Sequence, residues 1–416
     1  MTKKNPIYLT VLLVALSIAL TFQITMIATD GYDRLFADKN DTGSSSAELG
    51  ISEATLQKIK EVAARYAALY PGEMDPNLIE EYLISAFIAG AGDQFGNYVS
   101  AEDLEDYLSN IEGSFKGIGV SVIYDSTYNA MEIVSVFPDS PAEKAGILCG
   151  DIVIYVGIGE GRQSVSELGY YKALDLIRGE AGTNAEFVVL RDGTEIEFTV
   201  ERGEVTNQTV YFHMYEKDSR VAVIRITQFE KVTTEQFKVA LDSAKAAGAE
   251  AYVFDVRSNP GGELNAIVSV LDMLLPEGPI IRIEYKDSKN NVQMNSDASY
   301  LDAPMAVLCN GSTASAGELF CAALKDYDVA TLVGTKTFGK GTMQSLLPLS
   351  DGSGLSLTVA YYLPPYSENY HGVGVVPHVE CEISDELKNV NIHKYTDEND
   401  NQLAEAVKAL GLSPQS

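Results

Sequence analysis

The strongest constraint on the fold of this chain is a regular alternation of strand-like and helix-like segments between Arg220 and Gly334. The strand-like runs are RVAVIRITQF, AYVFDVR, MAVLCN and VATLVG, and the helix-like runs are TTEQFKVALDSAKAAG, ELNAIVSVLDMLL and SAGELFCAALKDY. This alternation is typical of an α/β core, in which the strand ends bring their following loops to one side of the sheet. We therefore expect the functional residues of the chain on these loops.

One of these loops, GSTASAGE from Gly311 to Glu318, joins a predicted strand to a predicted helix. At such a turn a serine hydroxyl is exposed above the sheet edge, and the first N–H groups of the helix face whatever is bonded to it. A serine or threonine in this place is otherwise an ordinary helix N-cap. The loop SNPGG, from Ser258 to Gly262, favours the functional interpretation, because its glycines bring further N–H donors to the same edge.

The loop GTKTFGKG, from Gly334 to Gly341, falls one residue short of a nucleotide-binding loop. Such a loop needs a hydroxyl directly after the lysine, to hold Mg²⁺, and a helix behind it. Here Gly341 follows Lys340, and the next residues, TMQSLLPLS, have the pattern of a strand. Lys340 is instead a candidate general base, provided that burial lowers its pKa far enough to leave the amine neutral. Gln344, on the same face of this strand as Thr342, is placed to hold the amine by a hydrogen bond.

The N-terminus of the chain has the pattern of a membrane segment. Lys3 and Lys4 precede a charge-free run of 25 residues from Asn5 to Thr29, which is long enough to cross a bilayer as a helix of ~20 residues. The lysines favour an orientation with the N-terminus inside, which makes the chain a single-pass protein of the cell membrane with its remainder outside the cytoplasm. We favour an uncleaved anchor at residues 1–30 because no clear A-x-A site follows; a cleaved signal peptide is the alternative.

A polar linker is expected at residues 31–46, followed by a helical region at 47–112. Two segments of that region, ISEATLQKIKEVAARYAALY and PNLIEEYLISAFIAGAG, carry apolar residues at helical spacing. Two amphipathic helices bury little surface alone. They therefore either cover another domain or pair with a second copy of the chain.

Between residues 113 and 202 the pattern changes to short strands, GIGVSVI, MEIVSVF, DIVIYVG, EFVVLR and EIEFTVE, interrupted by the helical patches SPAEKAG and SELGYYKALDLIRG. This order resembles a PDZ domain of the circularly permuted bacterial type; a plain β-rich domain is the alternative. A PDZ groove adds a peptide as an extra strand and holds its terminal carboxylate on backbone N–H groups. Arg178, at the end of the second helical patch, is either a sensor of the bound peptide or a solvated surface residue. The expected carboxylate-binding loop consists of Gly117, Ile118, Gly119 and Val120.

Together these motifs resemble the carboxyl-terminal processing proteases, or tail-specific proteases, over nearly the whole chain after the N-terminal segment. These are serine peptidases with a Ser-Lys-Gln catalytic set, an α/β core of the ClpP/crotonase type and an inserted PDZ domain. Their motifs S-A-S-A-S-E, T-F-G-K-G-x-x-Q, D-L-R-x-N-P-G-G and x-G-x-G-V-x-P-D-x-E are similar to GSTASAGE, TFGKGTMQ, DVRSNPGG and HGVGVVPHVE of this chain. The resemblance implies that Ser315 is the nucleophile, Lys340 the base and Gln344 the orienting residue. The oxyanion donors that it implies are the N–H groups of Gly261 and Ala316, with Gly262 as a neighbouring candidate.

The chain departs from these motifs at three places. Thr313 stands where the family often has alanine or serine, Gly317 replaces the last serine before Glu318, and Val256 replaces the leucine of D-L-R. None of these changes removes a catalytic group. Gly317 is expected to loosen the start of the helix.

The resemblance further implies a protease core at 203–380, a C-terminal tail at 381–416, protein or peptide substrates, a homodimer, and no cofactor. The candidate dimerisation elements are the N-terminal helix pair and the tail segment DENDNQLAEAVKALGL, with ordinary covering helices as the alternative. Two other functions stay open. One is a Ser-His-Asp hydrolase that uses His371 or His378, and the other is an inactive PDZ scaffold or pseudoprotease that binds C-terminal peptides.

Charge and cysteine content exclude several classes. Asp+Glu 59 against Lys+Arg 30 gives a net charge of −29, which argues against a nucleic acid as partner. The four cysteines stand singly, without the spacing of a zinc cluster or a disulfide scaffold, and the four histidines show no metal-ligand spacing. We expect Cys309 and Cys321, which flank the GSTASAGE loop, to be buried as small apolar residues.

Overall fold

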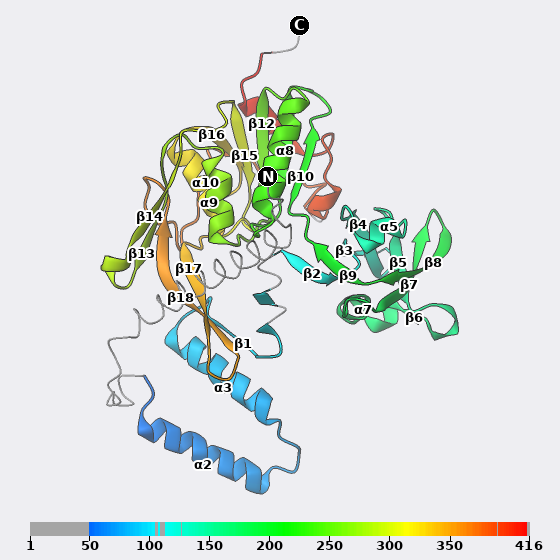
Figure 1. Cartoon of the computed structure of the whole chain (residues 1–416), viewed down its shortest axis with the longest axis vertical. Helices are drawn as coiled ribbons and strands as arrows, with labels where there is room; N and C mark the ends of the chain where they lie inside the picture. Colours follow the sequence, from blue (N-terminus) through cyan, green and yellow to red (C-terminus); the bar gives the residue numbers. More distant parts are fainter. Residues whose placement is uncertain (1–49, 105–106, 109–112, 126, 389, 414–416) are drawn as a thin grey trace, which may run out of the picture. The chain divides into compact units, whose positions relative to one another are not determined.

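The structure, a computed structural model, describes residues 50–104, 107–108, 113–125, 127–388 and 390–413 (Figure 1). The membrane segment expected at 1–30 and the linker expected at 31–46 lie outside the described residues. Within the described ranges, no helix combines the length and the apolar character that a membrane span requires. The chain divides into two units, one ending at Ile79 and one running from Glu80 onward.

Both helices predicted in the N-terminal region are present. α2 spans Glu53–Leu69, and the side chain of Ser52 accepts the N–H of Thr55 as its N-cap. α3 spans Pro76–Ala91 and begins with proline, which suits the first helical position because its missing N–H has no helical partner there. Among the described residues, no side chain of either helix is buried.

The second unit is built on a six-stranded sheet in the order β10-β11-β12-β15-β16-β19. Its strands are β10 (Val210–Met214), β11 (Val221–Ile226), β12 (Ala251–Asp255), β15 (Met305–Cys309), β16 (Ala330–Gly334) and β19 (Val379–Glu380). Neighbours from β11 to β19 run parallel, and β10 pairs antiparallel with β11. The predicted α/β core is therefore present, and the carboxyl ends of the adjacent strands β12, β15 and β16 meet at one edge of the sheet.

Successive side chains along each strand of this sheet point to opposite faces. Both faces are covered by helices. The first face carries Ile224, Phe254 and Val307 and packs in one apolar cluster with helices on that side. These helices are α8 (Thr233–Ala246), α9 (Leu264–Asp272) and α10 (Ala316–Asp326) (Figure 1). Cys309 and Cys321 belong to this cluster as free, fully buried thiols, as predicted.

The second face of the sheet is covered by α11 (Asn401–Ala409). Val223, Val253 and Leu308 of the strands form one cluster with Leu403 and Ala406 of this helix. Of the two interpretations of the tail segment, dimerisation element or covering helix, the structure supports the second, because its apolar face is buried within the same chain.

An antiparallel sheet that the sequence analysis did not predict completes the core. Its central strand, β18 (Gly354–Leu363), pairs with β1 (Asn97–Val99), β13 (Gly278–Tyr285) and β17 (Thr342–Pro348), and β14 (Val292–Ser296) pairs with β13. β17 is the strand predicted after the Lys340 loop. β1 lies inside the range 47–112, so part of the region assigned to N-terminal helices is a strand of the core.

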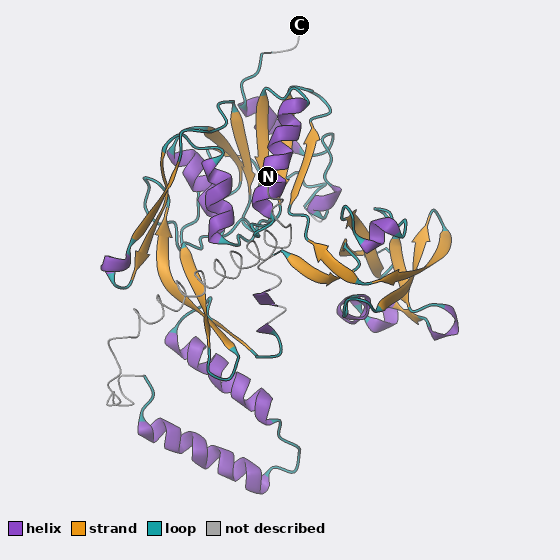
Figure 2. Cartoon of the chain, in the orientation of Figure 1, coloured by secondary structure: helices purple, strands orange, loops and turns teal. Residues whose placement is uncertain are grey.

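The residues between 113 and 206 form a separate β-rich insert with its own apolar core. Its sheet has the order β3-β4-β5-β7-β8, with β3 (Val120–Asp125), β4 (Ala130–Val136), β5 (Ile152–Val156), β7 (Asn184–Arg191), β8 (Thr194–Glu201) and the short β6 (Gln163–Ser164) beside β5. Asp192 and Gly193 both have positive φ, 50° and 77°, as the predicted two-residue hairpin turn requires. Figure 2 shows that strands dominate the insert.

The helical patch predicted at SELGYYKALDLIRG is two helices, α6 (Val165–Leu168) and α7 (Tyr170–Ile177). Gly169 separates them at φ 80°, a value that continues no right-handed helix. The other predicted patch is α5 (Pro141–Lys144). Two strands that enclose the insert, β2 (Ser114–Gly117) and β9 (Gly203–Thr206), pair antiparallel as a ribbon. The remaining elements are the 3₁₀ turns η1 (Gly159–Gly161), η2 (Ser288–Asn290) and η3 (Ile392–Lys394).

Candidate active site

Ser315 stands at the turn between β15 and α10, directly before the first residue of the helix. Its backbone has φ 54° and ψ −120°, a conformation that residues with a side chain rarely adopt. Strain of this kind costs about 1–3 kcal/mol and is typical of functional sites. Ser315 thus stands half-buried at the predicted strand-to-helix turn, in a backbone conformation that a simple N-cap does not need.

The SNPGG loop at the end of β12 lies against the Ser315 turn. A Cβ added to Gly261, which has φ 106°, would lie 2.6 Å from Ser315 Cβ, so only glycine allows this approach. The buried residue Asn259 joins the two loops, because its backbone carbonyl accepts the N–H of Ala314 at 2.8 Å and its side-chain Oδ1 accepts the N–H of Gly261 at 2.8 Å. The N–H of Gly261 is thus directed to Asn259. The neighbouring Gly262 lines the pocket described below.

The carboxylate of Glu318, in the first turn of α10, connects the serine turn to the Lys340 loop. It is fully buried and accepts the N–H of Ser315 at 3.0 Å and the N–H of Lys340 at 2.7 Å. It also accepts the hydroxyl of Thr337 at 2.6 Å and the N–H of Gly339 at 2.6 Å. A buried carboxylate with four donors is well compensated for its lost hydration. Glu318 therefore fixes the backbone of Lys340 relative to that of Ser315.

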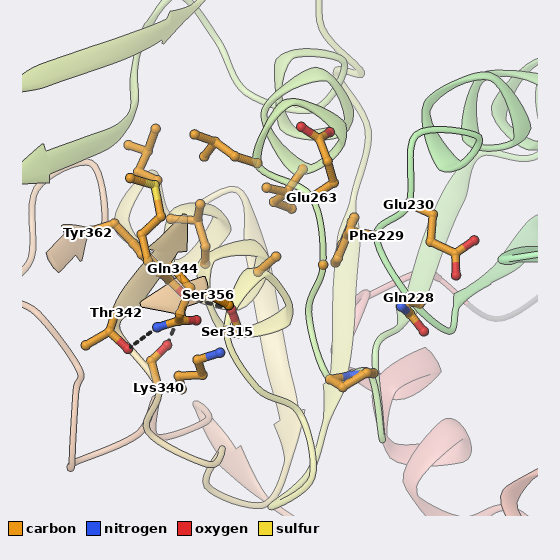
Figure 3. A pocket seen from close by; sticks show the side chains of 18 of the residues that line it. Gln228, Phe229, Glu230, Glu263, Ser315, Lys340, Thr342, Gln344, Ser356 and Tyr362 are labelled. Carbon is orange, nitrogen blue, oxygen red and sulfur yellow. Dashed lines mark hydrogen bonds between the residues drawn. The ribbon is translucent and has the colours of Figure 1, made fainter. Parts of the chain in front are cut away.

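The side chain of Lys340 lies in the same pocket as Ser315 (Figure 3). Its Nζ lies 4.6 Å from the centre of the Phe95 ring, within the range of a cation–π contact. Burial lowers the pKa of Lys340 below its usual value of 10.5, and the negative charges of Asp93 and Glu318 oppose only part of this effect. The shift has the direction that a general base requires.

Gln344 lies on β17 and faces the same space. Its Nε2 donates to the hydroxyl of Thr342 at 3.2 Å and to that of Thr358 at 3.1 Å. In Figure 3 the amide nitrogen of Gln344 points toward Thr342, and its oxygen lies on the side of Ser315 and Lys340. The structure thus brings the three residues of the predicted catalytic set together.

Two tyrosine hydroxyls complete the surroundings of Ser315. The hydroxyl of Tyr362 lies 3.2 Å from Ser315 Oγ and donates to the carbonyl of Lys340 at 2.9 Å. Tyr370 donates to the carbonyl of Ser315 at 3.3 Å. Burial raises the pKa of both tyrosines, so both hydroxyls are neutral and act as donors, not as bases.

A pocket of about 640 Å³ lies in front of Ser315. Lys340, Gln344, Gly262 and Ala316 all line it. Most of the remaining wall is apolar and consists of Phe229, Leu264, Ile267, Ile281, Leu319, Met343, Leu346 and Tyr362. The pocket therefore suits an extended peptide with an apolar side chain next to the serine.

The histidines considered for a Ser-His-Asp arrangement have other contacts. The ring of His378 accepts the N–H of Leu332 at 2.9 Å, which ties it to β16. The ring of His371 accepts the N–H of Gly341 at 3.4 Å. Among the described residues neither bonds to Ser315, so the structure favours the lysine. Within the same ranges, no group of three or more His, Cys, Asp or Glu residues is arranged to hold a metal ion.

The residues predicted to bind a peptide carboxylate lie in the insert, where β2 leads into β3. Gly119 has φ 85°, and a Cβ there would lie 2.3 Å from Ser140 Cβ, so the loop is pressed against the start of α5. The carbonyl of Ile118 accepts the N–H of Ala142 at 2.8 Å. Val120 begins β3, an edge strand of its sheet, and Gly117 ends β2. Arg178 is exposed at the end of α7.

Several residues of the site were not predicted from the sequence, among them Glu318 as a connector, Tyr362 and Asp93. Glu318 had a local signal, because a carboxylate three residues after a helix-capping serine is typical of a capping box. Tyr362 lies 47 residues after its partner Ser315, and Asp93 lies 265 residues before its partner Thr358. No local sequence pattern relates positions so far apart.

Comparison with known proteins places this chain in a family. A model described as "Peptidase family S41" matches residues 220–381. The carboxy-terminal processing protease CtpA of Bacillus subtilis is 32% identical over 83% of this chain and 72% of its own length. The carboxyl-terminal-processing protease of a Synechocystis species is 33% identical over 71% of this chain and 69% of its own. A solved S41 protease structure from Bacteroides fragilis, 17% identical, covers 82% of this chain and 92% of its own with a TM-score of 0.56, which shows a shared fold.

The α/β core and these relatives together define a serine-type peptidase. The chain belongs to peptidase family S41 and is a serine endopeptidase of the carboxy-terminal processing type. The predicted family and class of enzyme are thus confirmed, and an inactive scaffold is not what the relatives indicate.

Proposed function

We propose that Ser315 is the nucleophile, Lys340 the general base and Gln344 the residue that orients the lysine amine. The neutral amine of Lys340 takes the proton of Ser315 Oγ as this oxygen attacks the carbonyl of a peptide bond. The resulting ammonium then gives its proton to the leaving amine. Water, activated by the same lysine, hydrolyses the acyl-enzyme and releases the serine.

The oxyanion of the tetrahedral intermediate is stabilised by backbone N–H groups on both sides of Ser315. Ala316 supplies one, because it is the first residue of α10 and has no helical partner for its N–H. The SNPGG loop supplies another. Because the N–H of Gly261 is directed to Asn259, we assign this second donor to Gly262, which lines the pocket.

The observation that carries this proposal is the carboxylate of Glu318, which fixes the backbone N–H groups of both Ser315 and Lys340. The test measures cleavage of an unfolded protein by the wild type, Ser315→Ala, Lys340→Ala and the double variant. We expect each single variant to lose most of the activity and the double variant to lose little more, because the two groups act as a unit. A Lys340→Ala enzyme with near-normal turnover contradicts the assignment.

We further propose that the insert is a PDZ domain that binds the free C-terminus of the substrate. β3 is the edge strand of its sheet, and the hydroxyl of Tyr170 on α7 donates to the carbonyl of Val122 at 3.1 Å. α7 thus lies beside an edge at which a peptide can pair as an additional strand. Gly119 and its neighbours precede this edge and supply the backbone around the carboxylate. Arg178 remains a candidate sensor of the bound peptide.

The remaining proposals concern location and assembly. We propose that the catalytic unit lies outside the cytoplasm on an N-terminal anchor. Protease added to intact cells should then digest this unit, and full protection of the unit would contradict the proposal. The apolar residues of α2 and α3, none of which is buried, favour a homodimer. Sedimentation analysis of a form that lacks residues 1–30 tests this, and a monomer at high micromolar concentration contradicts it.

A further inference from the structure

The segment between α3 and β1 is fixed to the antiparallel sheet by one side chain, Asp93. Its Oδ2 accepts the N–H of Thr358 on β18 at 2.8 Å, and its Oδ1 accepts the hydroxyl of the same threonine at 2.8 Å. The N–H of Phe95 donates to Oδ1 at 3.1 Å. The Asp93 carboxylate therefore accepts hydrogen bonds from both the N–H and the hydroxyl of Thr358, a residue 265 positions away in the sequence.

The direction of these hydrogen bonds follows from the number of available protons. Burial raises the pKa of Asp93, but hydrogen bonds from Thr358, Phe95 and Gly96 outweigh this effect and lower it, so the carboxylate is ionised at neutral pH. An ionised carboxylate only accepts. Thr358 has one hydroxyl proton, and this proton is given to Asp93.

The hydroxyl oxygen of Thr358 is left as an acceptor, and the group opposite it is the side-chain amide of Gln344 at 3.1 Å. Only the nitrogen end of that amide can donate to it. The reverse orientation would place two oxygens against each other and leave both without a proton between them. Asp93 thus determines, through Thr358, which end of the Gln344 amide faces the threonines and which faces the pocket.

We propose that Asp93 and Thr358 are positioning residues that keep the Gln344 oxygen directed toward Lys340. This inference rests on the proposed function of Lys340. An oxygen at this place accepts a proton of the lysine amine and leaves the lone pair of the amine free for the proton of Ser315. A reversed amide would donate to that lone pair and block it.

Several groups around the Lys340 amine affect its pKa. The carboxylates of Asp93 and Glu318 raise the pKa, and burial lowers it by a larger amount. The ring of Phe95 lies 4.6 Å from Nζ and favours the ammonium form. His371 lies beside the same loop, with its ring 6.2 Å from that of Phe95. An amide nitrogen directed at the amine would disfavour the ammonium form and lower the pKa further.

The test uses the full chain and three substitutions. In Asp93→Asn the new side-chain oxygen accepts the Thr358 N–H, and the new nitrogen donates to the Thr358 hydroxyl. The hydroxyl proton of Thr358 then points to Gln344, so the oxygen end of the Gln344 amide turns toward Thr358. Thr358→Val removes the hydroxyl but keeps the charge of Asp93, and Thr358→Ser keeps both. Asp272→Asn is the matched control, because Asp272 also accepts a backbone N–H, from Asp297 at 2.7 Å, outside this network.

We expect kcat of Asp93→Asn and Thr358→Val to fall by about tenfold or more, the equivalent of one lost hydrogen bond in the transition state. KM should change by less than about twofold. In Asp93→Asn the rising limb of the pH–rate profile should also move to lower pH, because both the lost charge and the reversed amide lower the pKa of Lys340. Thr358→Ser and Asp272→Asn should retain wild-type kinetics.

Thermal unfolding of every variant separates positioning from folding. If Asp93→Asn is unfolded at the assay temperature, the pair Thr358→Val and Thr358→Ser decides. Equal kcat for this pair, or a loss of activity in a folded Asp93→Asn without any shift of the pH limb, overturns the inference. These results leave the lysine assignment intact, whereas full activity of Lys340→Ala would refute the proposed function itself.

Discussion

At the scale of single residues, the environment of Lys340 leads to a prediction about pH. Burial holds the pKa of its amine below 10.5, and only the neutral amine accepts the serine proton. Activity should therefore be low when the ammonium predominates and should rise with pH through this lowered pKa. The measurement is kcat/KM between pH 5 and pH 10, with exposed Lys336 of the same loop as the control in Lys336→Ala. A rate that does not change with pH would argue against a lysine base.

The two departures from the family motif on either side of Ser315 explain each other. A Cβ on Gly317 would lie 3.1 Å from Thr313 Cγ2 and 3.1 Å from the carbonyl oxygen of Asn259. Thr313 is fully buried, and its hydroxyl donates to the carbonyl of Val256 at 2.8 Å, so its methyl group cannot turn away freely. A serine at 317 and a threonine at 313 thus compete for the same space. α10 begins at Ala316, so Gly317 lies in its first turn.

This competition predicts a non-additive pair of substitutions. Gly317→Ser alone should lower the free energy of unfolding by about 1–3 kcal/mol through overpacking. Thr313→Ser keeps the hydroxyl bond and removes only the methyl group, so in the double variant the cost of the serine at 317 should fall. Urea unfolding of the four proteins measures the coupling energy, which for residues in contact is about 0.5–3 kcal/mol. Strict additivity would show that the methyl group of Thr313 is not the obstacle.

At the scale of elements, α11 is a structural part of the core. Leu403 of this helix is 4% exposed, and together with Ala406 it packs against Val253 of the sheet in one apolar cluster. Its N-cap, Asp400, also forms an ion pair of 2.6 Å with the buried Arg257, close to the SNPGG loop. The tail of the chain therefore supports the edge of the sheet that carries the site.

Leu403→Ala should lower the free energy of unfolding by about 2–5 kcal/mol, as expected for a buried leucine. Lys408→Ala, an exposed change on the same helix, is the control and should have little effect. Thermal unfolding provides the measurement. If Leu403→Ala dissociated a dimer without lowering the unfolding temperature of the monomer, α11 would be an interface helix after all.

The parallel strands and their loops were predictable because both depend on local sequence. Strand runs, helical periodicity and glycine-rich turns all lie within ten or so neighbouring positions, and they placed Ser315 and Lys340 on the loops that follow the adjacent strands β15 and β16. The antiparallel sheet was not predicted, because β1, β13 and β18 pair across large separations, and local sequence patterns do not show which distant strands pair. Asp93 was missed for the same reason.

At the scale of the whole molecule, the proposed recognition of a free C-terminus is tested with paired peptides. One peptide sequence, ending either in a carboxylate or in an amide, is cleaved by the wild type and by Gly119→Ala. The wild type should prefer the free carboxylate, because binding energy from a remote groove promotes the reaction. In Gly119→Ala the preference should disappear, since a Cβ there would lie 2.3 Å from Ser140 Cβ.

Gly182→Ala is the matched control for this experiment. Gly182 also lies in the insert with positive φ, 81°, but a Cβ there would meet no atom within 4 Å. It should therefore retain the preference for the free carboxylate. Equal cleavage of both peptides by the wild type would rule out recognition of the terminal carboxylate and leave the insert as a spacer or a lid.

The ribbon formed by β2 and β9 has a consequence for the topology of the chain. The N–H of Asn207 donates to the carbonyl of Gly113 at 2.9 Å, so the polypeptide leaves the core and returns to it at nearly the same point. A short turn that joins residue 113 to residue 207 would close the core into a continuous chain without any rerouting of its strands.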